Sequence, residues 1–286
     1  MSALIIWEAV LEAFLDSIKS LPFLFLAFWG LEALEKHSNQ FVQKMLSGAR
    51  IGGPAIGAGL GLIPQCGFSA ALADLYAGGA ITLGTMLAVF LATSDEAILI
   101  LMSQPSTIGK VWPLLLSKLV IGIVAGYMVD IVIRLIRGRN AKEREVGDIC
   151  TDCGCHNAEG TVKPAIIHTA KTFAWLLGIS IVIEVLMELA GADAIASALG
   201  NGTWYQPLLT ALFGLIPNCA VSVAFTELYI AGSLSFASTV AGLCSGAGVG
   251  LIVLFKVNPN KKQCFAIAFL LYAIAAVCGV ALNIFT

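Results

Sequence analysis

The sequence predicts an all-α integral membrane protein made of two inverted-topology repeats, each with a re-entrant helical hairpin. Three observations support this prediction: apolar runs long enough to cross a membrane, an internal duplication, and opposite placement of basic loop residues in the two halves. Of the 286 residues, 58% are hydrophobic and 12% are charged, against roughly 25% charged residues in soluble domains. The lipid bilayer is therefore expected to surround most of the chain.

A helix of about 20 apolar residues crosses the hydrocarbon core of a bilayer. The predicted spanning segments are Leu21 to Leu34, Ile81 to Met102, Val111 to Ile133, Ile166 to Leu189, Leu234 to Phe255 and Phe265 to Phe285. Met1 to Val10 lacks the basic residues that begin a secretory signal, so the chain is expected to stay uncleaved. The net charge of -2 and the lack of an extended basic face argue against nucleic acid as a partner.

An internal duplication divides the chain into two halves. Gly61 to Tyr76 reads GLIPQCGFSAALADLY, and Gly214 to Tyr229 reads GLIPNCAVSVAFTELY, so the motif recurs after 153 residues. Self-similarity of this length predicts a repeated architecture. The predicted boundaries are 1–140 for the first inverted repeat, 141–160 for a linker and 161–286 for the second inverted repeat.

Basic residues in short loops favour the cytoplasmic side of a membrane. Lys36, Lys44 and Arg50 share one loop of the first half, whereas the equivalent loop of the second half has no Lys or Arg. The loop before Val111 shows the reverse, because it carries one Lys and its counterpart carries three. The two halves are therefore predicted to have opposite orientations, with a cytoplasmic central linker and an external C-terminus.

The repeated motif is predicted to form a re-entrant hairpin. Residues 51–63 and 68–77 are too short to cross separately, because about 13 helical residues rise roughly 20 Å against a core of about 30 Å. The hairpin tips would be Pro64, Gln65 and Cys66 in one half and Pro217, Asn218 and Cys219 in the other. Carriers place their sites at such breaks in the middle of the membrane. The alternative is that Gly and Pro simply permit tight packing.

The tips carry the candidate substrate ligands. Cys66 and Cys219 offer soft thiols, which suit soft metals and trivalent metalloids, although a free Cys is also a small buried hydrophobe. Gln65 and Asn218 have donors and acceptors that can replace the hydration of a polar solute.

Acidic residues near the tips are candidates for coupling or cation binding, because carboxylates inside a membrane are costly and tend to face a cavity or a partner. Asp74 and Glu227 occupy matching positions and could bind a cation or carry coupling protons. Alternatively, they lie near the membrane interface and merely meet water. Ser94, Asp95 and Glu96 interrupt an apolar helix of the first half, and the second half has no acidic counterpart. The alternative for these three residues is a structural hydrogen-bonding role. Gly242, Gly246 and Gly250 are predicted to let another helix approach closely.

The predicted linker groups Cys150, Cys153, Cys155 and His156 within seven residues. Thiols and imidazole are soft-metal ligands, so metal capture or sensing is one interpretation and a redox-inert loop is the other. No resident cofactor is expected, and self-association into a homo-oligomer is compatible with the sequence.

Several motifs resemble those of the ten-transmembrane heavy-metal exporter family: GLIPQCGFS at 61–69, LYAG at 75–78 and ATSDEA at 92–97, together with the Pro-Asn-Cys turn and the Cys/His linker. Members of this family are described as arsenic efflux proteins or manganese transporters, and the group is akin to organoarsenical permeases. The resemblance implies a multi-pass protein of the inner (plasma) membrane that exports a metal or metalloid. Together with less clear apolar segments, the six spans named above give a predicted seven or eight full spans plus two hairpins. A count of ten would require counting the hairpin arms separately.

The expected function is secondary transport by alternating access. The chain has no Walker A sequence, so direct ATP hydrolysis is not supported. A transporter of a small organic solute or anion, or an ion channel on the same hairpin pair, is the alternative. An enzyme is not expected, because the three His residues at 37, 156 and 168 are scattered and no nucleophile-base pair is visible.

Overall fold

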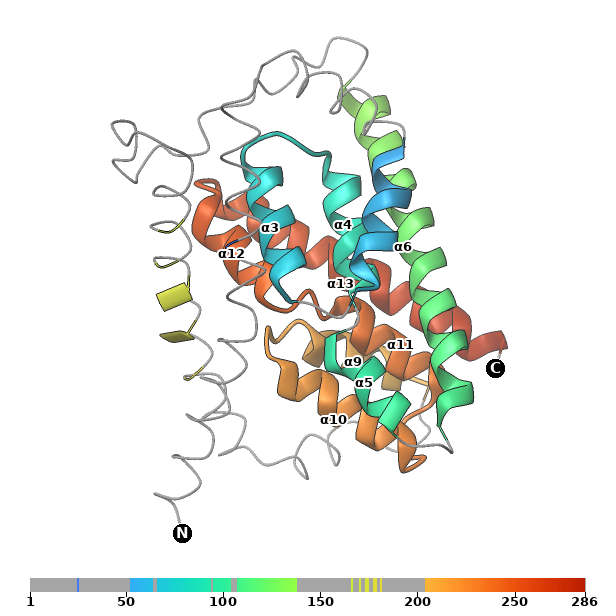
Figure 1. Cartoon of the computed structure of the whole chain (residues 1–286). Coiled ribbons are helices and arrows are strands. Elements are labelled where there is room, and N and C mark those ends of the chain that lie inside the picture. The colour runs from blue at the N-terminus through green and yellow to red at the C-terminus, as the bar shows by residue number, and fades with distance from the viewer. Residues whose placement is uncertain are drawn as a thin grey trace.

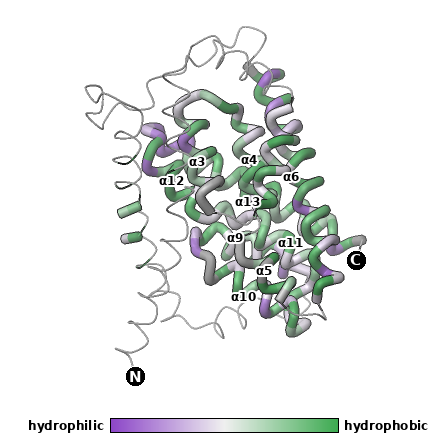
Figure 2. The backbone as a smooth tube through the Cα atoms, in the orientation of Figure 1, coloured by the Kyte–Doolittle hydropathy of each residue, from purple (hydrophilic) through white to green (hydrophobic). Residues whose placement is uncertain are grey.

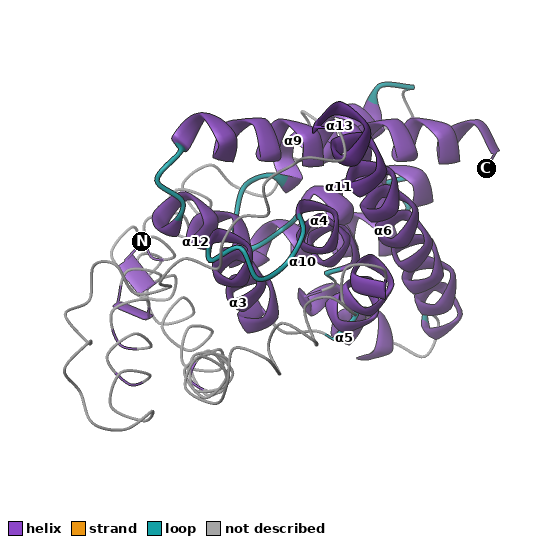
Figure 3. Ribbon diagram, turned by 90° about the horizontal axis from the view of Figure 1, so that it is seen from above, coloured by secondary structure: helices purple, strands orange, loops and turns teal. Residues whose placement is uncertain are grey.

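The computed structural model describes residues 52–63, 66–93, 95–103, 107–137 and 204–285, together with residues 25, 166, 170, 173, 174, 177, 178 and 181. Throughout these residues the secondary structure is helical and contains no strand (Figure 3). Residues 52–61 form the first of the continuous helices. It is followed by α3 (Cys66–Ala77), α4 (Leu83–Ala92), α5 (Asp95–Ser103), α6 (Ile108–Arg137), α9 (Gln206–Gly214), α10 (Cys219–Ile230), α11 (Phe236–Ser245), α12 (Val249–Val257) and α13 (Lys261–Phe285).

Helices of the second half follow one another in the same order and with nearly the same lengths as those of the first. α3 and α10 have 12 residues each, α4 and α11 have 10, and α5 and α12 have 9. Each pair is followed by a long apolar helix, α6 with 30 residues and α13 with 25. The duplicated motif therefore belongs to a longer succession of matching helices.

Three segments of the described chain are long and apolar enough to cross a membrane: Ile108–Ile136, Phe236–Val257 and Lys261–Ile284. They coincide with three of the predicted spans. α6 and α13 expose large apolar side chains, among them Trp112, Leu116, Val120, Met128, Phe265 and Phe269. Hydrophilic residues gather toward the helix ends in Figure 2. An apolar exterior with polar ends is compatible with a membrane protein.

The predicted span Ile81 to Met102 is two helices, because the chain leaves the helical path between α4 and α5. Thr93 caps α4, and both its N–H and its Oγ1 donate to the Val89 carbonyl, the latter at 2.8 Å. Residue 94 lies outside the described residues, and α5 begins at Asp95. The predicted interruption near Thr93 is thus present.

A second interruption separates α11 from α12, inside the segment expected to be one continuous helix. Gly246 caps α11, and Gly248 has a φ of 52°, which a side chain at Cβ would disfavour. Gly246 was expected to serve helix packing; it ends α11, and a Cβ there would lie 3.6 Å from the Gly214 carbonyl oxygen of α9. Close packing does hold for Gly242 against the Phe225 ring and for Gly250 against Ser69 and Phe90.

α4 packs between two helices through residues without bulky side chains. Along α6 it runs antiparallel, with Gly84 against Gly126 and Ala88 against Gly122. Along residues 52–61 it runs parallel, because Gly53 lies near Thr85 and Gly61 near Val89 and Ala92. Small residues permit this close approach of helix backbones. In the second half, Gly214 of α9 meets the Gly242 carbonyl of α11 in the same manner.

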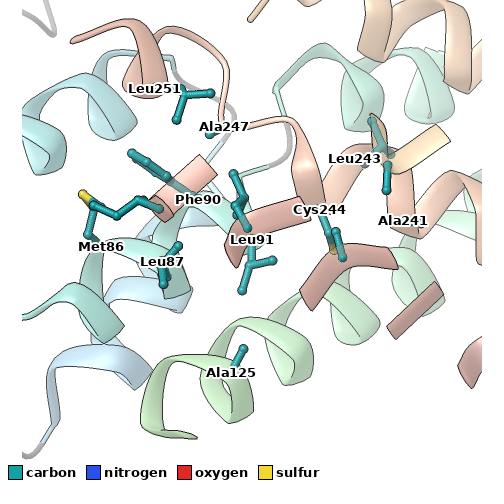
Figure 4. Close-up of a cluster of buried hydrophobic side chains, with 14 of the residues drawn as sticks. Met86, Leu87, Phe90, Leu91, Ala125, Ala241, Leu243, Cys244, Ala247 and Leu251 are labelled. Carbon is teal, nitrogen blue, oxygen red and sulfur yellow. The ribbon is translucent and has the colours of Figure 1, made fainter. Parts of the chain in front are cut away.

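Helices of one half pack against helices of the other half. α3 lies against α12, while their counterparts α10 and α5 lie against one another. The upper part of Figure 1 contains α3, α4 and α12, and the lower part contains α5, α9, α10 and α11. α4 and α11 occupy the interior, since every residue of Gly84 to Ala92 and of Ala237 to Ser245 is buried. Figure 4 shows Phe90 and Leu91 of α4 close to Cys244 of α11 and Ala247.

α4 and α11 begin with matching caps. The Thr82 Oγ1 accepts from the Thr85 N–H and the Ser235 Oγ accepts from the Ser238 N–H, each at 3.1 Å. The supporting groups differ, because the Asp130 carboxylate accepts from Thr82 Oγ1 at 2.7 Å, whereas the Gln206 Oε1 accepts from Ser238 Oγ at 2.9 Å. A capping side chain satisfies backbone donors that the first helical turn leaves without partners.

Removal of either cap is expected to destabilise the fold measurably. Thr82→Ala and Ser235→Ala should each lower the free energy of unfolding by about 1 kcal/mol, as measured by denaturing-detergent titration of the purified protein. Lys262→Ala is the control, because this side chain is exposed near the start of α13. Equal stability of all three variants and the parent would contradict a capping role.

Candidate functional site

A small cavity lies where the interrupted helices of both halves meet. Its walls include Thr93 after α4, Asn218 before α10, Ser222 in α10, and Gly242, Gly246 and Gly248 around the break between α11 and α12. The space admits about one water-sized particle. Groups from the two sequence halves therefore share one interior site.

The turn at 215–218 is built by local hydrogen bonds at the end of α9. The Leu215 N–H donates to the Leu212 carbonyl, and the Ile216 N–H donates to the Phe213 carbonyl at 3.0 Å. Pro217 has no N–H and cannot continue the helix. The Asn218 N–H then donates to the Ile216 carbonyl at 2.8 Å, and α10 begins at the next residue. Asn218 is thereby placed at the cavity.

Both kinds of helix end surround this cavity. α4, α9 and α11 finish beside it with carbonyl groups, and α10 and α12 begin beside it with N–H groups. Helix N-termini carry partial positive charge and C-termini partial negative charge. Such an arrangement can interact with charged or strongly polar solutes without a permanent charge on the lining side chains.

Lys118 is a fully buried cation next to this cavity. It has no exposed surface and lies within the apolar stretch of α6. Its Nζ donates to the Thr93 carbonyl, and to the Leu243 carbonyl at 3.0 Å. Both acceptor residues line the cavity.

Lys118 was not among the residues selected from the sequence. The signal was available, because a basic residue in the middle of an apolar spanning segment is by default a functional candidate. Lys118 is neither acidic nor part of the duplicated motif, the two features on which the predicted residues depended.

The predicted tip residues are described only in part. Pro64, Gln65 and Ser94 lie outside the described residues. Cys66 and Cys219 begin α3 and α10, and their side chains lie outside the described part. Pro217 and Asn218 are half-buried in the turn, and Asn218 lines the cavity.

The matching acids Asp74 and Glu227 differ in environment. Asp74 is buried on α3, with Lys256 of α12 acting on it electrostatically, whereas Glu227 is exposed on α10. Equivalence in sequence therefore does not make these two carboxylates equivalent in structure. Asp95 and Glu96 form the first residues of α5, and their side chains fall outside the described part.

Metal ligands are sparse in the described residues, which contain no group of three or more His, Cys, Asp or Glu side chains able to hold a metal ion. The predicted linker ligands Cys150, Cys153, Cys155 and His156 lie outside the described residues. Cys244 and Cys264 are buried free thiols.

Two tyrosines at matching positions join the halves. The Gln263 Nε2 on α13 donates to the Tyr76 hydroxyl on α3 at 2.6 Å. The Lys110 Nζ on α6 lies 4.7 Å from the centroid of the Tyr229 ring on α10. Tyr229 follows Tyr76 by 153 residues, and Gln263 follows Lys110 by the same interval. These are corresponding contacts, and neither was predicted from the sequence.

Long apolar helices, interrupted helices and a small cavity at the breaks make up an all-helical chain that is compatible with a membrane protein. The sequence family described as "Putative, 10TM heavy-metal exporter" matches residues 2–192, which is more than half of the chain, and the protein belongs to this family. The resemblance found in the motifs is thereby confirmed. Curated proteins gave no match, and neither did solved structures.

Proposed function

We propose that the protein is a secondary transporter of the cell inner membrane that exports a heavy metal or metalloid by alternating access. The observation that carries this proposal is the packing of each half against the other, in which α3 lies against α12 and α10 lies against α5. Membership of the exporter family supports the direction of transport and the substrate class.

The contacts support an inverted-repeat architecture with re-entrant hairpins. Residues 52–61 run parallel to α4, so α3 between them must return toward the side from which residues 52–61 started. α4 and α11 approach from opposite parts of the molecule in Figure 1, and carbonyls near their C-terminal ends reach the same Lys118 ammonium. Interrupted helices meeting in this way are typical of carriers with inverted repeats.

The distribution of charge supports the proposed orientation. Arg134 near the end of α6 belongs to the side that continues into the linker, and Lys256 and Lys261 flank the junction of α12 and α13. The Tyr76 contact with Gln263 belongs to this proposed cytoplasmic side, and the Tyr229 contact with Lys110 belongs to the external side. Basic residues on one side agree with the positive-inside rule.

Substrate would bind between the hairpin tips. The amides of Gln65 and Asn218 and the thiols of Cys66 and Cys219 are the proposed ligands, with Asp95 and Glu96 supplying cation or proton coupling. Thiols favour arsenicals and soft cations, whereas manganese prefers oxygen ligands. The cavity in the described residues is small, so the proposed cycle requires the site to open for substrate.

Flux measurements in reconstituted vesicles test the proposed function. Uptake of Mn, Zn, Cd, arsenite and methylarsenite should identify a substrate with saturable, proton-dependent transport. Ohmic single-channel currents would establish a channel instead. Transport of an organic solute or anion, with none of the five tested substrates carried, would overturn the substrate class.

Replacement of both tip thiols is expected to remove transport of a thiophilic substrate. Cys66→Ser combined with Cys219→Ser should lower arsenite or methylarsenite flux by about tenfold or more, since soft substrates bind thiolates far better than hydroxyls. Cys278→Ser in α13 is the matched control and should retain flux. Unchanged tolerance to arsenite, methylarsenite and divalent metals in cells expressing the double variant would exclude thiol ligation.

A further inference from the structure

The ammonium of Lys118 joins two places where a helix stops. Thr93 is the C-cap of α4, and Leu243 lies in the last turn of α11, two residues before its end. Carbonyls in the last turn of a helix have no partner within that helix. Each also lies at the negative end of a helix dipole. The acceptors thus come from matching helices of the two halves.

Main-chain carbonyls at the ends of interrupted helices are the ligands with which carriers bind monovalent coupling cations. Here the Lys118 Nζ donates to such carbonyls at the centre of the described bundle. A role in packing alone would not require a charge, because an ammonium removed from water is far more costly to bury than a methyl group. The contacts therefore indicate that the positive charge itself is used.

We propose that the Thr93 and Leu243 carbonyls form part of a monovalent-cation site, and that the Lys118 ammonium is its covalently tethered occupant. The tethered charge holds the ends of α4 and α11 together, as a bound alkali cation would. The protein then has no need of free sodium or potassium at this site. Only its use in a transport cycle rests on the proposed function; the site itself does not.

Other ionisable groups surround this position. Cys244 follows Leu243 in α11, and Cys278 of α13 lies close enough to Cys244 to interact electrostatically. Asp95 and Glu96 begin α5 shortly after Thr93, with side chains outside the described part. A carboxylate in contact with Lys118 would make the site a charge pair, and the substitutions Asp95→Asn and Glu96→Gln distinguish that arrangement from a cation site.

Two substitutions of Lys118 distinguish charge from packing. Lys118→Ala removes the ammonium and leaves space for a small cation, whereas Lys118→Met keeps the bulk of the side chain without the charge. Both should lower the melting temperature of the purified protein by roughly 5 to 15 °C. Leu116→Ala is the control on the same helix, because that side chain is exposed on the apolar surface.

Added cations should rescue only the Ala variant. Ammonium or ethylammonium is expected to restore at least about half of the lost melting temperature of Lys118→Ala, because binding to the folded state alone stabilises it. Neutral ethanol should have no such effect, and neither Lys118→Met nor Leu116→Ala should respond to the cations. Failure of ammonium, ethylammonium, sodium and potassium to stabilise Lys118→Ala would overturn the inference. If a second substitution, Asp95→Asn or Glu96→Gln, restored the melting temperature of Lys118→Ala instead, Lys118 would be assigned to a charge pair. That result would also overturn the inference.

Flux measurements on the same variants then test whether the site is used in transport. Flux through Lys118→Ala should fall about tenfold or more and should recover with ethylammonium, whereas ethylammonium should not change flux through the parent protein. If the parent protein transports none of the tested substrates but cations restore the melting temperature of Lys118→Ala, the cation site stands and the proposed transport function fails. If the parent transports and no cation rescues the variant by either readout, the proposed function stands and the cation site fails.

Discussion

Gly84→Ala is expected to destabilise the protein by about 3 kcal/mol or more, although Ala favours helices over Gly. The new Cβ would lie 2.5 Å from the Asp130 Cγ and 2.6 Å from its Oδ1, and would overlap the Gly126 carbonyl oxygen. Overpacking in a tight interior typically costs about 1–3 kcal/mol. A further cost arises because the Asp130 Oδ1 accepts from the Gly84 N–H at 2.9 Å, and displacing a carboxylate weakens a charge-assisted hydrogen bond.

The matched control for this substitution is Gly59→Ala. Gly59 belongs to the helix at 52–61, and a Cβ there would meet no atom within 4 Å. Without a steric penalty, the change should be neutral or stabilise by up to about 1 kcal/mol through helix propensity. Denaturing-detergent titration and the yield of monodisperse protein measure both variants. Equal stability of Gly84→Ala and Gly59→Ala would show that α4 and α6 do not approach as closely as the structure indicates.

Several features of the fold could be predicted from the sequence. α6 and α13 are continuous apolar segments, so hydropathy alone located them. The matching helices around the duplicated motif were also accessible, because the interval of 153 residues is visible in the sequence. The interruption near Thr93 was signalled by polar and acidic residues in an apolar run. These features depend on local composition.

The second interruption could not be recognised in this way. Gly246 and Gly248 carry no polar side chain, and glycine permits both a close helix contact and a break. Which of the two occurs depends on what lies opposite: Gly242 faces the Phe225 ring, while Gly246 has no comparably close neighbour and ends the helix. That distinction belongs to tertiary packing and is absent from local sequence.

The candidate site likewise combines a residue that could be predicted from local sequence with contacts that depend on tertiary packing. Asn218 was predicted from the repeated turn and lines the cavity. The pairing of Lys118 with Thr93 and Leu243 depends on how three helices cross, one of them 125 residues away in the sequence. The burial of Asp74 and exposure of Glu227 likewise depend on which helix covers each residue. The repeated sequence therefore pointed to the turn that carries Asn218 but did not give the environment of the side chains around it.

Covalent locking of either tyrosine contact between the halves is expected to stop transport completely. In the proposed cycle, the contact of Tyr76 with Gln263 closes the cytoplasmic side, and the contact of Tyr229 with Lys110 closes the external side. Each must open once per cycle for substrate to pass. Tyr76→Cys with Gln263→Cys, or Lys110→Cys with Tyr229→Cys, joined by a reducible bifunctional thiol reagent, should therefore reduce flux to background, and reduction should restore it.

The two locked proteins should fail in opposite ways, which separates alternating access from a general loss of mobility. With the Tyr76 contact locked, substrate should still bind from the external side and not from the cytoplasmic side, and the reverse should hold with the Tyr229 contact locked. Binding to oriented vesicles measures this sidedness, and the single-Cys variants treated with the same reagent control for the native thiols. In the proposed inverted arrangement, the two contacts lie at opposite ends of one central site, and a carrier exposes that site to one side at a time. Continued flux with either contact locked would mean that the contact does not open during transport, and identical sidedness in both would contradict the inverted arrangement.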